Sequence, residues 1–232
     1  MKQVSILIPT RKRFEMFKKS ISSLYETCND VNNFEILVAT DTDDEDTTNQ
    51  IKEFFQDKTN IKYFVFERQY YYGFHHYINN LSYQASGDFL FLWGDDAVMK
   101  SKNWDVEILN YSNSFCMLSP KVDNMEDYWR DQGVLFPIIP KTWVDITGVF
   151  SLSPSCDSWA DVLSKKLGVF TNLETVVLTH ERYDLIGTNN DENFHESREA
   201  LKHPNYQHID DNMMNKINEH IEQIKNHLQL MS

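Results

Sequence analysis

Apolar runs of strand length alternate with segments of helical periodicity through the first hundred residues. Pro9 closes the first run, since proline cannot donate to a strand ladder. Apolar side chains then recur at steps of three and four between Phe14 and Leu24, which predicts an amphipathic helix over residues 14–25. The same alternation predicts strands at 4–10, 35–40, 61–66 and 89–93, with further helices at 47–55 and from residue 74 onward.

Repeated strand–helix units of this kind are typical of an α/β fold. The connections are long enough for right-handed crossovers between parallel strands. We therefore expect a mostly parallel, twisted sheet flanked by helices.

The pattern loses this regularity after residue 98. Tryptophans and prolines scattered over 103–150 indicate shorter strands and loops. A helix that starts near 153–158 and ends at Gly168 is followed by an apolar, strand-like run from 169 to 180. Residues 183–208 are polar and lack periodicity, which predicts a loop.

Apolar residues return at helical steps between 209 and 230. They predict an amphipathic C-terminal helix that packs on the domain or pairs with a second copy of the chain. We expect one domain over residues 1–182, followed by a loop and this helix over 183–232.

Composition narrows the function classes. The formal net charge of -13 over 232 residues argues against nucleic acid or an anionic membrane as a partner. The three cysteines are widely spaced, so neither a disulfide framework nor a cysteine zinc site is indicated. No apolar run reaches the length of a membrane span or of a signal-peptide core. The expected location is the cytoplasm.

The strongest chemical signal is a pair of neighbouring acids, Asp95 and Asp96, directly after the buried strand that Gly94 ends. The carboxyl ends of strands are where open α/β sheets bind ligands. Two adjacent carboxylates repel each other unless a cation or hydrogen bonds compensate, and Mg²⁺ or Mn²⁺ shared with substrate phosphates would do so. The alternative is a solvated turn whose acids cap the next helix.

Two other strand ends carry residues suited to a nucleotide. Pro9, Thr10, Arg11 and Arg13 fall in the loop between the first strand and its helix, where the arginines are placed to meet a base or a phosphate. Asp41 ends the second strand and is a candidate acceptor for a nucleotide base. The alternative for the basic residues is a solvated helix start, which we prefer for Lys12.

In this order, the segments Val4–Arg13, Glu35–Asp41 and Gly87–Asp96 resemble the opening strand and nucleotide loop, the base-binding strand and the DXD metal strand of GT-A glycosyltransferases of the family 2 type. The likeness covers residues 4–180. It implies a GT-A fold with a nucleotide-binding half over about 1–98 and an acceptor half over about 99–182. Trp93 stands where the family has the first acid of DXD, so that contact is lost or is supplied by Asp96.

The resemblance also assigns the remaining site residues. The catalytic base of the family opens a helix that ends with glycine about eleven residues later, which here gives Asp157, with Cys156 in place of the preceding acid. A helix N-cap is the alternative for Asp157, and Asp161 is the reserve base. His180 is similar to a histidine that such enzymes add as a metal or pyrophosphate contact, and Asp191 falls in the following loop.

The expected function is a metal-dependent, inverting transfer of sugar from a nucleotide diphosphate sugar to an acceptor hydroxyl. Mn²⁺ or Mg²⁺ is the implied cofactor, a UDP-sugar the favoured donor, and a carbohydrate or other hydroxyl compound the acceptor. Two alternatives remain open: a GT-like binding or assembly protein with impaired turnover, and a sugar-phosphate nucleotidyltransferase. The second usually carries a glycine-rich phosphate loop, whereas residues 9–13 contain no glycine.

Overall fold

An eight-stranded sheet forms the middle layer of the computed structural model, which describes residues 3–125, 133–187 and 191–231. The strand order is β3-β2-β1-β4-β7-β6-β8-β5. The strands are β1 (Val4–Pro9), β2 (Phe34–Asp41), β3 (Ile61–Phe66), β4 (Phe89–Leu92), β5 (Ala97–Met99), β6 (Met117–Val122), β7 (Ile138–Pro140) and β8 (Phe170–His180).

The first half of the sheet is parallel, as the strand–helix alternation predicts. β1 lies between β2 and β4, and β3 pairs with β2 on the outside. Every residue of β2 and β4 is buried, which is why their sequences are continuous apolar runs. The second half is mixed: β6 and β8 are parallel, whereas β7 runs antiparallel to β4 and β6, and β5 runs antiparallel to β8.

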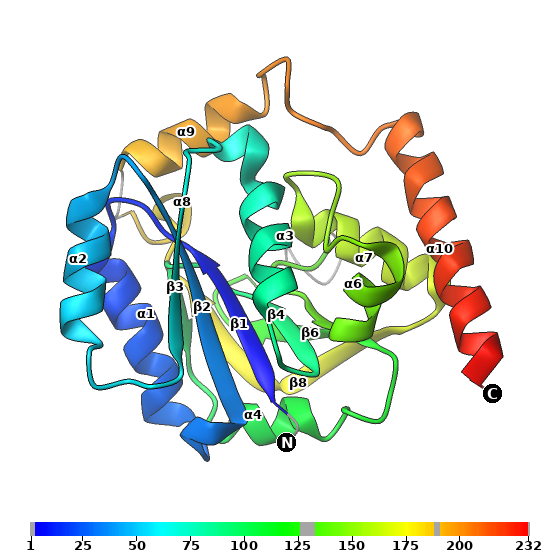
Figure 1. Ribbon diagram of the computed structural model, residues 1–232, viewed down its shortest axis with the longest axis horizontal. Coiled ribbons are helices and arrows are strands. Elements are labelled where there is room, and N and C mark those ends of the chain that lie inside the picture. Colours follow the sequence, from blue (N-terminus) through cyan, green and yellow to red (C-terminus); the bar gives the residue numbers. More distant parts are fainter. Residues whose placement is uncertain (1–2, 126–132, 188–190, 232) are drawn as a thin grey trace.

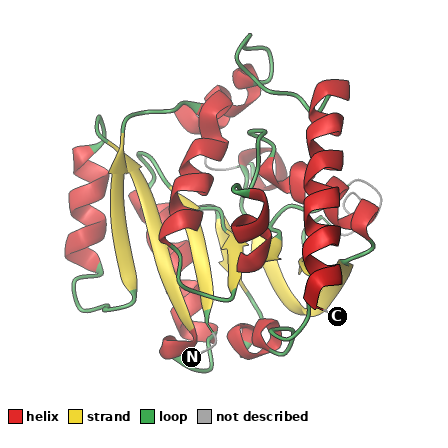
Figure 2. Cartoon of the chain, turned by 45° about the vertical axis from the view of Figure 1, so that its right-hand side comes forward, coloured by secondary structure: helices red, strands yellow, loops and turns green. Residues whose placement is uncertain are grey.

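Helices cover both faces of the sheet (Figures 1 and 2). One apolar core joins the sheet to helices α1, α2 and α4, and a second core joins the other face to α3, α6, α7 and α10. The helices are α1 (Phe14–Thr27), α2 (Glu45–Phe54), α3 (Phe74–Gln84), α4 (Trp104–Leu109), α6 (Lys141–Thr147), α7 (Cys156–Leu167), α8 (Tyr183–Ile186), α9 (Glu192–Ala200) and α10 (Asp211–Met231), with short 3-10 turns η1 (Val31–Asn33) and η2 (Tyr71–Gly73).

The C-terminal helix α10 packs on the domain. Its residues Ile217, Ile221 and Ile224 are buried in the core shared with α6 and α7. The apolar stripe that the sequence offers for pairing is therefore covered by the same chain, and an oligomer through α10 stays a prediction. In the part of the chain that the structure describes, no helix has the length and apolar character to cross a bilayer.

The prediction of a loop over residues 183–208 is wrong. This segment contains α8 and α9, and α9 crosses above the carboxyl ends of the first strands (Figure 1). The apolar periodicity that indicates a helix packed on a core is missing because Ala200 is the one buried side chain of α9. Polar contacts hold this helix instead, and they lie at the candidate site.

Candidate functional site

The predicted site residues converge on one edge of the sheet. The register pairs Pro9 of β1 with Ala39 of β2, and Leu7 of β1 with Leu92 of β4, so these three strands end side by side. Thr10, Asp41 and the segment 94–96 follow at those ends. Convergence at the carboxyl edge is expected for open α/β sheets, and it brings together residues up to 85 positions apart in the sequence.

Internal donors compensate the acid pair. Asp95 accepts hydrogen bonds from the Thr10 hydroxyl at 2.8 Å and from the Arg13 guanidinium at 3.1 Å. Asp96 faces Nε2 of His180 at 3.2 Å and lies 3.9 Å from Arg13. Arg13 and these hydrogen bonds compensate the two carboxylates in this structure, and a divalent cation beside them stays a prediction.

The two carboxyl groups differ in acidity. Burial raises the pKa of Asp95 to about 6, with the charge of Asp96 adding to the shift and Arg13 opposing it. Burial acts in the same direction on Asp96, but His180 and Arg13 outweigh it and lower the pKa of Asp96. At neutral pH Asp96 is ionised, whereas Asp95 loses its proton only as the pH rises through about 6.

The donor atoms at this edge suit a divalent cation that is shared with a ligand. Among the described residues, no group of three or more His, Cys, Asp or Glu side chains is placed to hold an ion. Mg²⁺ needs only one or two carboxylates when substrate phosphates complete its shell, and imidazole is an acceptable Mn²⁺ ligand. Asp95, Asp96 and His180 fit such a site, but not an all-protein cage.

A small cavity, here called the inner cavity, occupies about 80 Å³ between the ends of β1 and β2. It is lined by Pro9, Thr10, Arg11, Arg13, Asp41 and Asp95 among others. The structure thus places all the predicted nucleotide residues except Gly94 around one space. Asp41 is buried there and accepts hydrogen bonds from the hydroxyl of Tyr77 and from Arg11, while burial raises the pKa of its carboxyl.

A second cavity of about 290 Å³, the acid cavity, adjoins it. Its walls include Arg13, Gly94, Asp95, Asp96, Asp157 and His180. Asp157 lies at the start of α7, and its Oδ1 accepts from the backbone amide of Ser158 at 2.7 Å. Ser155 holds the N-cap position but makes no side-chain cap bond, so Asp157 is not the N-cap residue, although it binds an amide of the first turn. Burial raises the pKa of Asp157, which suits a carboxylate that accepts a proton.

The reserve base lies outside the acid cavity, and the altered DXD position lines that cavity without bringing an acid to it. Asp161 pairs with Lys165 at 2.7 Å and is not among the residues that line the acid cavity. The indole of Trp93 is buried in the core, where its Nε1 donates to Ser20 at 2.8 Å. The first position of the motif therefore supports the fold and brings no acidic group to the site.

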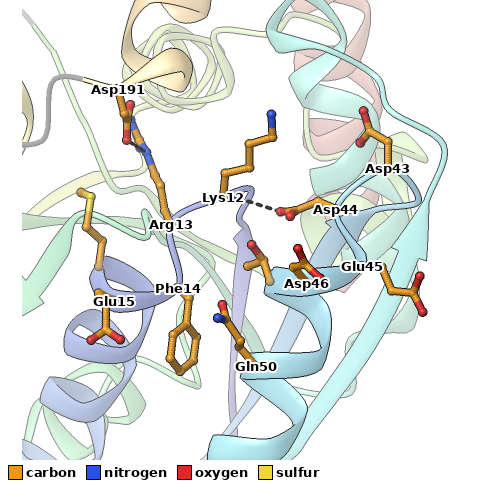
Figure 3. A pocket seen from close by; sticks show the side chains of 12 residues that line it. Lys12, Arg13, Phe14, Glu15, Asp43, Asp44, Glu45, Asp46, Gln50 and Asp191 are labelled. Carbon is orange, nitrogen blue, oxygen red and sulfur yellow. Dashed lines mark hydrogen bonds and ion pairs between the residues drawn. The ribbon is translucent and has the colours of Figure 1, made fainter.

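A third and larger hollow of about 730 Å³, the outer groove, opens between the starts of α1 and α2 (Figure 3). Four acids of one segment, residues 43–46, form one wall. Lys12, at its rim, donates its backbone amide to Asp44 at 2.7 Å and its ammonium to Glu192 at 2.9 Å. Because acids dominate this wall, the groove is unfavourable for phosphate despite its volume.

The tyrosine run at 70–72 is the part of the site that sequence reasoning missed, since such runs are more often core. Tyr71 lines both the inner and the acid cavity, and burial of its hydroxyl beside Asp96 raises the pKa of that group. Tyr70 has φ 53° and ψ 176°, a conformation normally reserved for glycine. Strain at such a residue marks functional sites, but it leaves no trace in residue type.

Replacing Gly94 by alanine is expected to reduce activity and, because it displaces Asp96, to lower stability as well. The new Cβ would lie 2.7 Å from Oδ1 of Asp96 and 3.2 Å from the ring of Phe136, so the carboxylate must swing away from His180. The measurement is turnover beside the melting temperature of both proteins. Gly168→Ala is a contrasting control: nothing lies near its Cβ, yet its φ of 73° makes alanine strained, so it should lower stability and spare activity.

Similarity to known proteins agrees with this geometry. The model of glycosyl transferase family 2 matches residues 5–122, just over half of the chain. No curated protein sequence matches. Among solved structures, the mannosyltransferase PcManGT from Pyrobaculum calidifontis, in complex with GDP-Man and Mn²⁺, aligns with a TM-score of 0.67 and 12% identity over 86% of this chain and 60% of its own.

Staphylococcus aureus TarS 1–349 aligns as well. Its complex with UDP-GlcNAc gives a TM-score of 0.58 and 19% identity over 84% of this chain and 64% of TarS 1–349. This chain thus spans less than two thirds of either structure, and the likeness establishes a shared GT-A fold. The matched family segment includes most of β1, all of β2, the loop over residues 10–13 and the acid pair. The chain belongs to glycosyl transferase family 2.

Proposed function

We propose that the protein transfers a sugar from a nucleoside diphosphate sugar to an acceptor hydroxyl, with inversion at the anomeric carbon and with a divalent cation. The observation that carries this proposal is the acid cavity, in which Asp157 shares one space with Asp95, Asp96 and Arg13. A proton acceptor and a site for phosphate charge are the two things that the reaction requires.

The inner cavity is the proposed place for the nucleoside. Asp41 offers a buried carboxylate oxygen to a base N–H, and Tyr77 fixes its orientation. Arg11 and Arg13 lie at the exit toward the acid cavity and are suited to the pyrophosphate, because guanidinium groups bind phosphate through paired hydrogen bonds. These contacts do not distinguish UDP from GDP, and a UDP-sugar remains the favoured donor.

Asp95, Asp96 and His180 are the proposed metal ligands. A bound Mn²⁺ or Mg²⁺ would supply positive charge to the leaving diphosphate. With such a cation bound, Asp95 would turn from Arg13 toward it, and the guanidinium would become available to a phosphate oxygen. The raised pKa of Asp95 implies that donor binding weakens as the pH falls below about 6, because the protonated carboxyl no longer attracts a cation.

Asp157 is the proposed base. Its carboxylate accepts the proton of the acceptor hydroxyl while that oxygen bonds to the anomeric carbon, and the nucleoside diphosphate leaves from the opposite face. A raised pKa brings the carboxylate closer to the strength that this transfer needs at neutral pH.

The proposal is tested by the melting temperature of the protein with UDP, GDP and their sugars, each with Mn²⁺ and with EDTA. A ligand that binds only the folded state stabilises that state, by about 2.7 kcal/mol at a hundredfold excess over Kd, and therefore raises the melting temperature. We expect a shift with a nucleotide and Mn²⁺ that EDTA removes. No shift with any nucleotide would contradict the proposal.

Turnover separates the two alternatives. Release of nucleoside diphosphate from the bound donor, even by slow hydrolysis, is expected of a transferase and not of a pure binding or assembly protein. A nucleotidyltransferase would instead release inorganic pyrophosphate from a nucleoside triphosphate and a sugar phosphate.

A further inference from the structure

Helix α9 and its N-cap place acidic side chains on the basic residues of the donor site. Asp191 binds Arg13 through two hydrogen bonds of 2.6 Å, one to Nε and one to the second terminal nitrogen (Figure 3). Glu196 binds the guanidinium of Arg68 and accepts from the backbone amide of Tyr71 at 3.1 Å. These are the hydrogen bonds that phosphate oxygens would make, because a bidentate carboxylate and a phosphate present similar acceptor pairs to arginine.

The same helix closes the cavities. Asn193 and Glu196 line the inner cavity, and Ser197 and Leu201 line the acid cavity. With α9 in place, the inner cavity measures about 80 Å³, well below the ~300 Å³ at which small-molecule pockets begin. The space beside Asp41 is therefore too small for a nucleoside in this structure, and α9 supplies two of the side chains that bound it.

Polar contacts rather than a buried face hold α9, and besides those of Asp191 and Glu196 they include the ion pairs Glu192–Lys12 and Arg198–Asp184. Ala200 is its one buried residue, and a nine-residue helix is marginal by itself. In the Asp191–Arg13 pair, the Arg13 side chain is 10% exposed and the Asp191 side chain 31%. Hydrogen bonding to Arg13 outweighs burial and lowers the pKa of Asp191, so the ion pair between them is charged at neutral pH.

We propose that α9 is an internal competitor of the donor: Asp191 and Glu196 occupy Arg13 and Arg68 in the resting protein, and a nucleoside diphosphate displaces them and opens the inner cavity. This inference rests on the proposed function and adds its regulation. The diphosphate of a nucleotide sugar carries two negative charges, as many as the two carboxylates together, so their exchange would conserve the charge balance around both guanidinium groups.

The test is the double variant Asp191→Asn with Glu196→Gln. Asparagine keeps the N-cap bond that Asp191 makes to the amide of Phe194, so the helix start is preserved while its charge is lost. Glu199→Gln is the matched control, since Glu199 lies on the same helix and pairs only with the exposed Lys202 among the contacts described. Binding of UDP and GDP with Mn²⁺ is measured by titration calorimetry, and amide hydrogen exchange of α9 is measured without ligand.

We expect the double variant to bind the preferred nucleotide about tenfold more tightly, because the closed form reduces apparent affinity by the fraction of molecules that are open. Its α9 amides should exchange faster than those of the Glu199→Gln protein, which should match the native chain in both measurements. Unchanged or weaker nucleotide binding by the double variant, or unchanged amide hydrogen exchange of α9, would overturn the proposal that α9 competes with the donor and would leave the proposed function standing. Failure of every protein to bind either nucleotide would count against the proposed function itself and would remove the inference with it.

Discussion

Replacing Asp157 by asparagine is expected to lower sugar transfer by about a hundredfold to ten-thousandfold, the contribution of a general base, while nucleotide binding stays intact. Asparagine keeps the shape of the side chain, and its oxygen still accepts from the amide of Ser158. What it loses is the ability to take a proton from the acceptor. The measurement is the rate of transfer under single-turnover conditions beside the Kd for the nucleotide.

The control is Asp161→Asn on the next turn of α7. That carboxylate pairs with Lys165 and lies outside the acid cavity, so its loss should leave transfer within about twofold of the native rate. If Asp161→Asn rather than Asp157→Asn abolished transfer, the base would be misassigned. If both variants retained the native rate, a carboxylate base on α7 would be excluded.

The parallel half of the fold was predictable because each of its strands can be recognised from the hydrophobic pattern of its own residues. All eight residues of β2 are buried, and the helix that follows β1 repeats its apolar residues at helical spacing. The end of α7 was equally predictable, since Gly168 adopts the left-handed conformation that a C-cap favours. Given parallel strands, the meeting of Thr10, Asp41 and Asp95 at one edge follows from topology alone.

The roof of the site was not predictable in the same way. α9 buries only Ala200, and its defining contacts join Asp191 to Arg13 across 178 positions and Glu196 to Tyr71 across 125. Periodicity reports burial against a core, and it is silent about a helix held by distant ion pairs. For the same reason, a cation could be expected beside Asp95, but its identity as Arg13 could not.

Replacing Asp95 and Asp96 by asparagine should change the stability of the fold in opposite directions. Asp95→Asn and Asp96→Asn are both expected to reduce transfer by about a hundredfold or more, because each removes a proposed ligand of the cation that offsets the leaving charge. Their effects on stability differ. The folded protein raises the pKa of Asp95 from 3.8 to about 6, so between these values the native state keeps a proton that the unfolded chain releases. Stability therefore falls as the pH rises through this window, and above it the ionised Asp95 destabilises the fold.

Asp96 has the opposite sign. Although burial opposes its ionisation, His180 and Arg13 lower its pKa, so its carboxylate stabilises the fold at neutral pH and this contribution disappears on acidification below its usual range. Urea unfolding at about pH 4.5 and about pH 7.5 should show Asp95→Asn gaining about 1 to 3 kcal/mol relative to the native protein as the pH rises. Asp96→Asn should lose about 1 to 3 kcal/mol at both pH values, because both lie above the range in which Asp96 titrates and His180 and Arg13 lose a charged partner. Equal and parallel changes in the two variants would show that the carboxylates share one environment, and the division of roles between a metal-responsive Asp95 and a firmly ionised Asp96 would then be wrong.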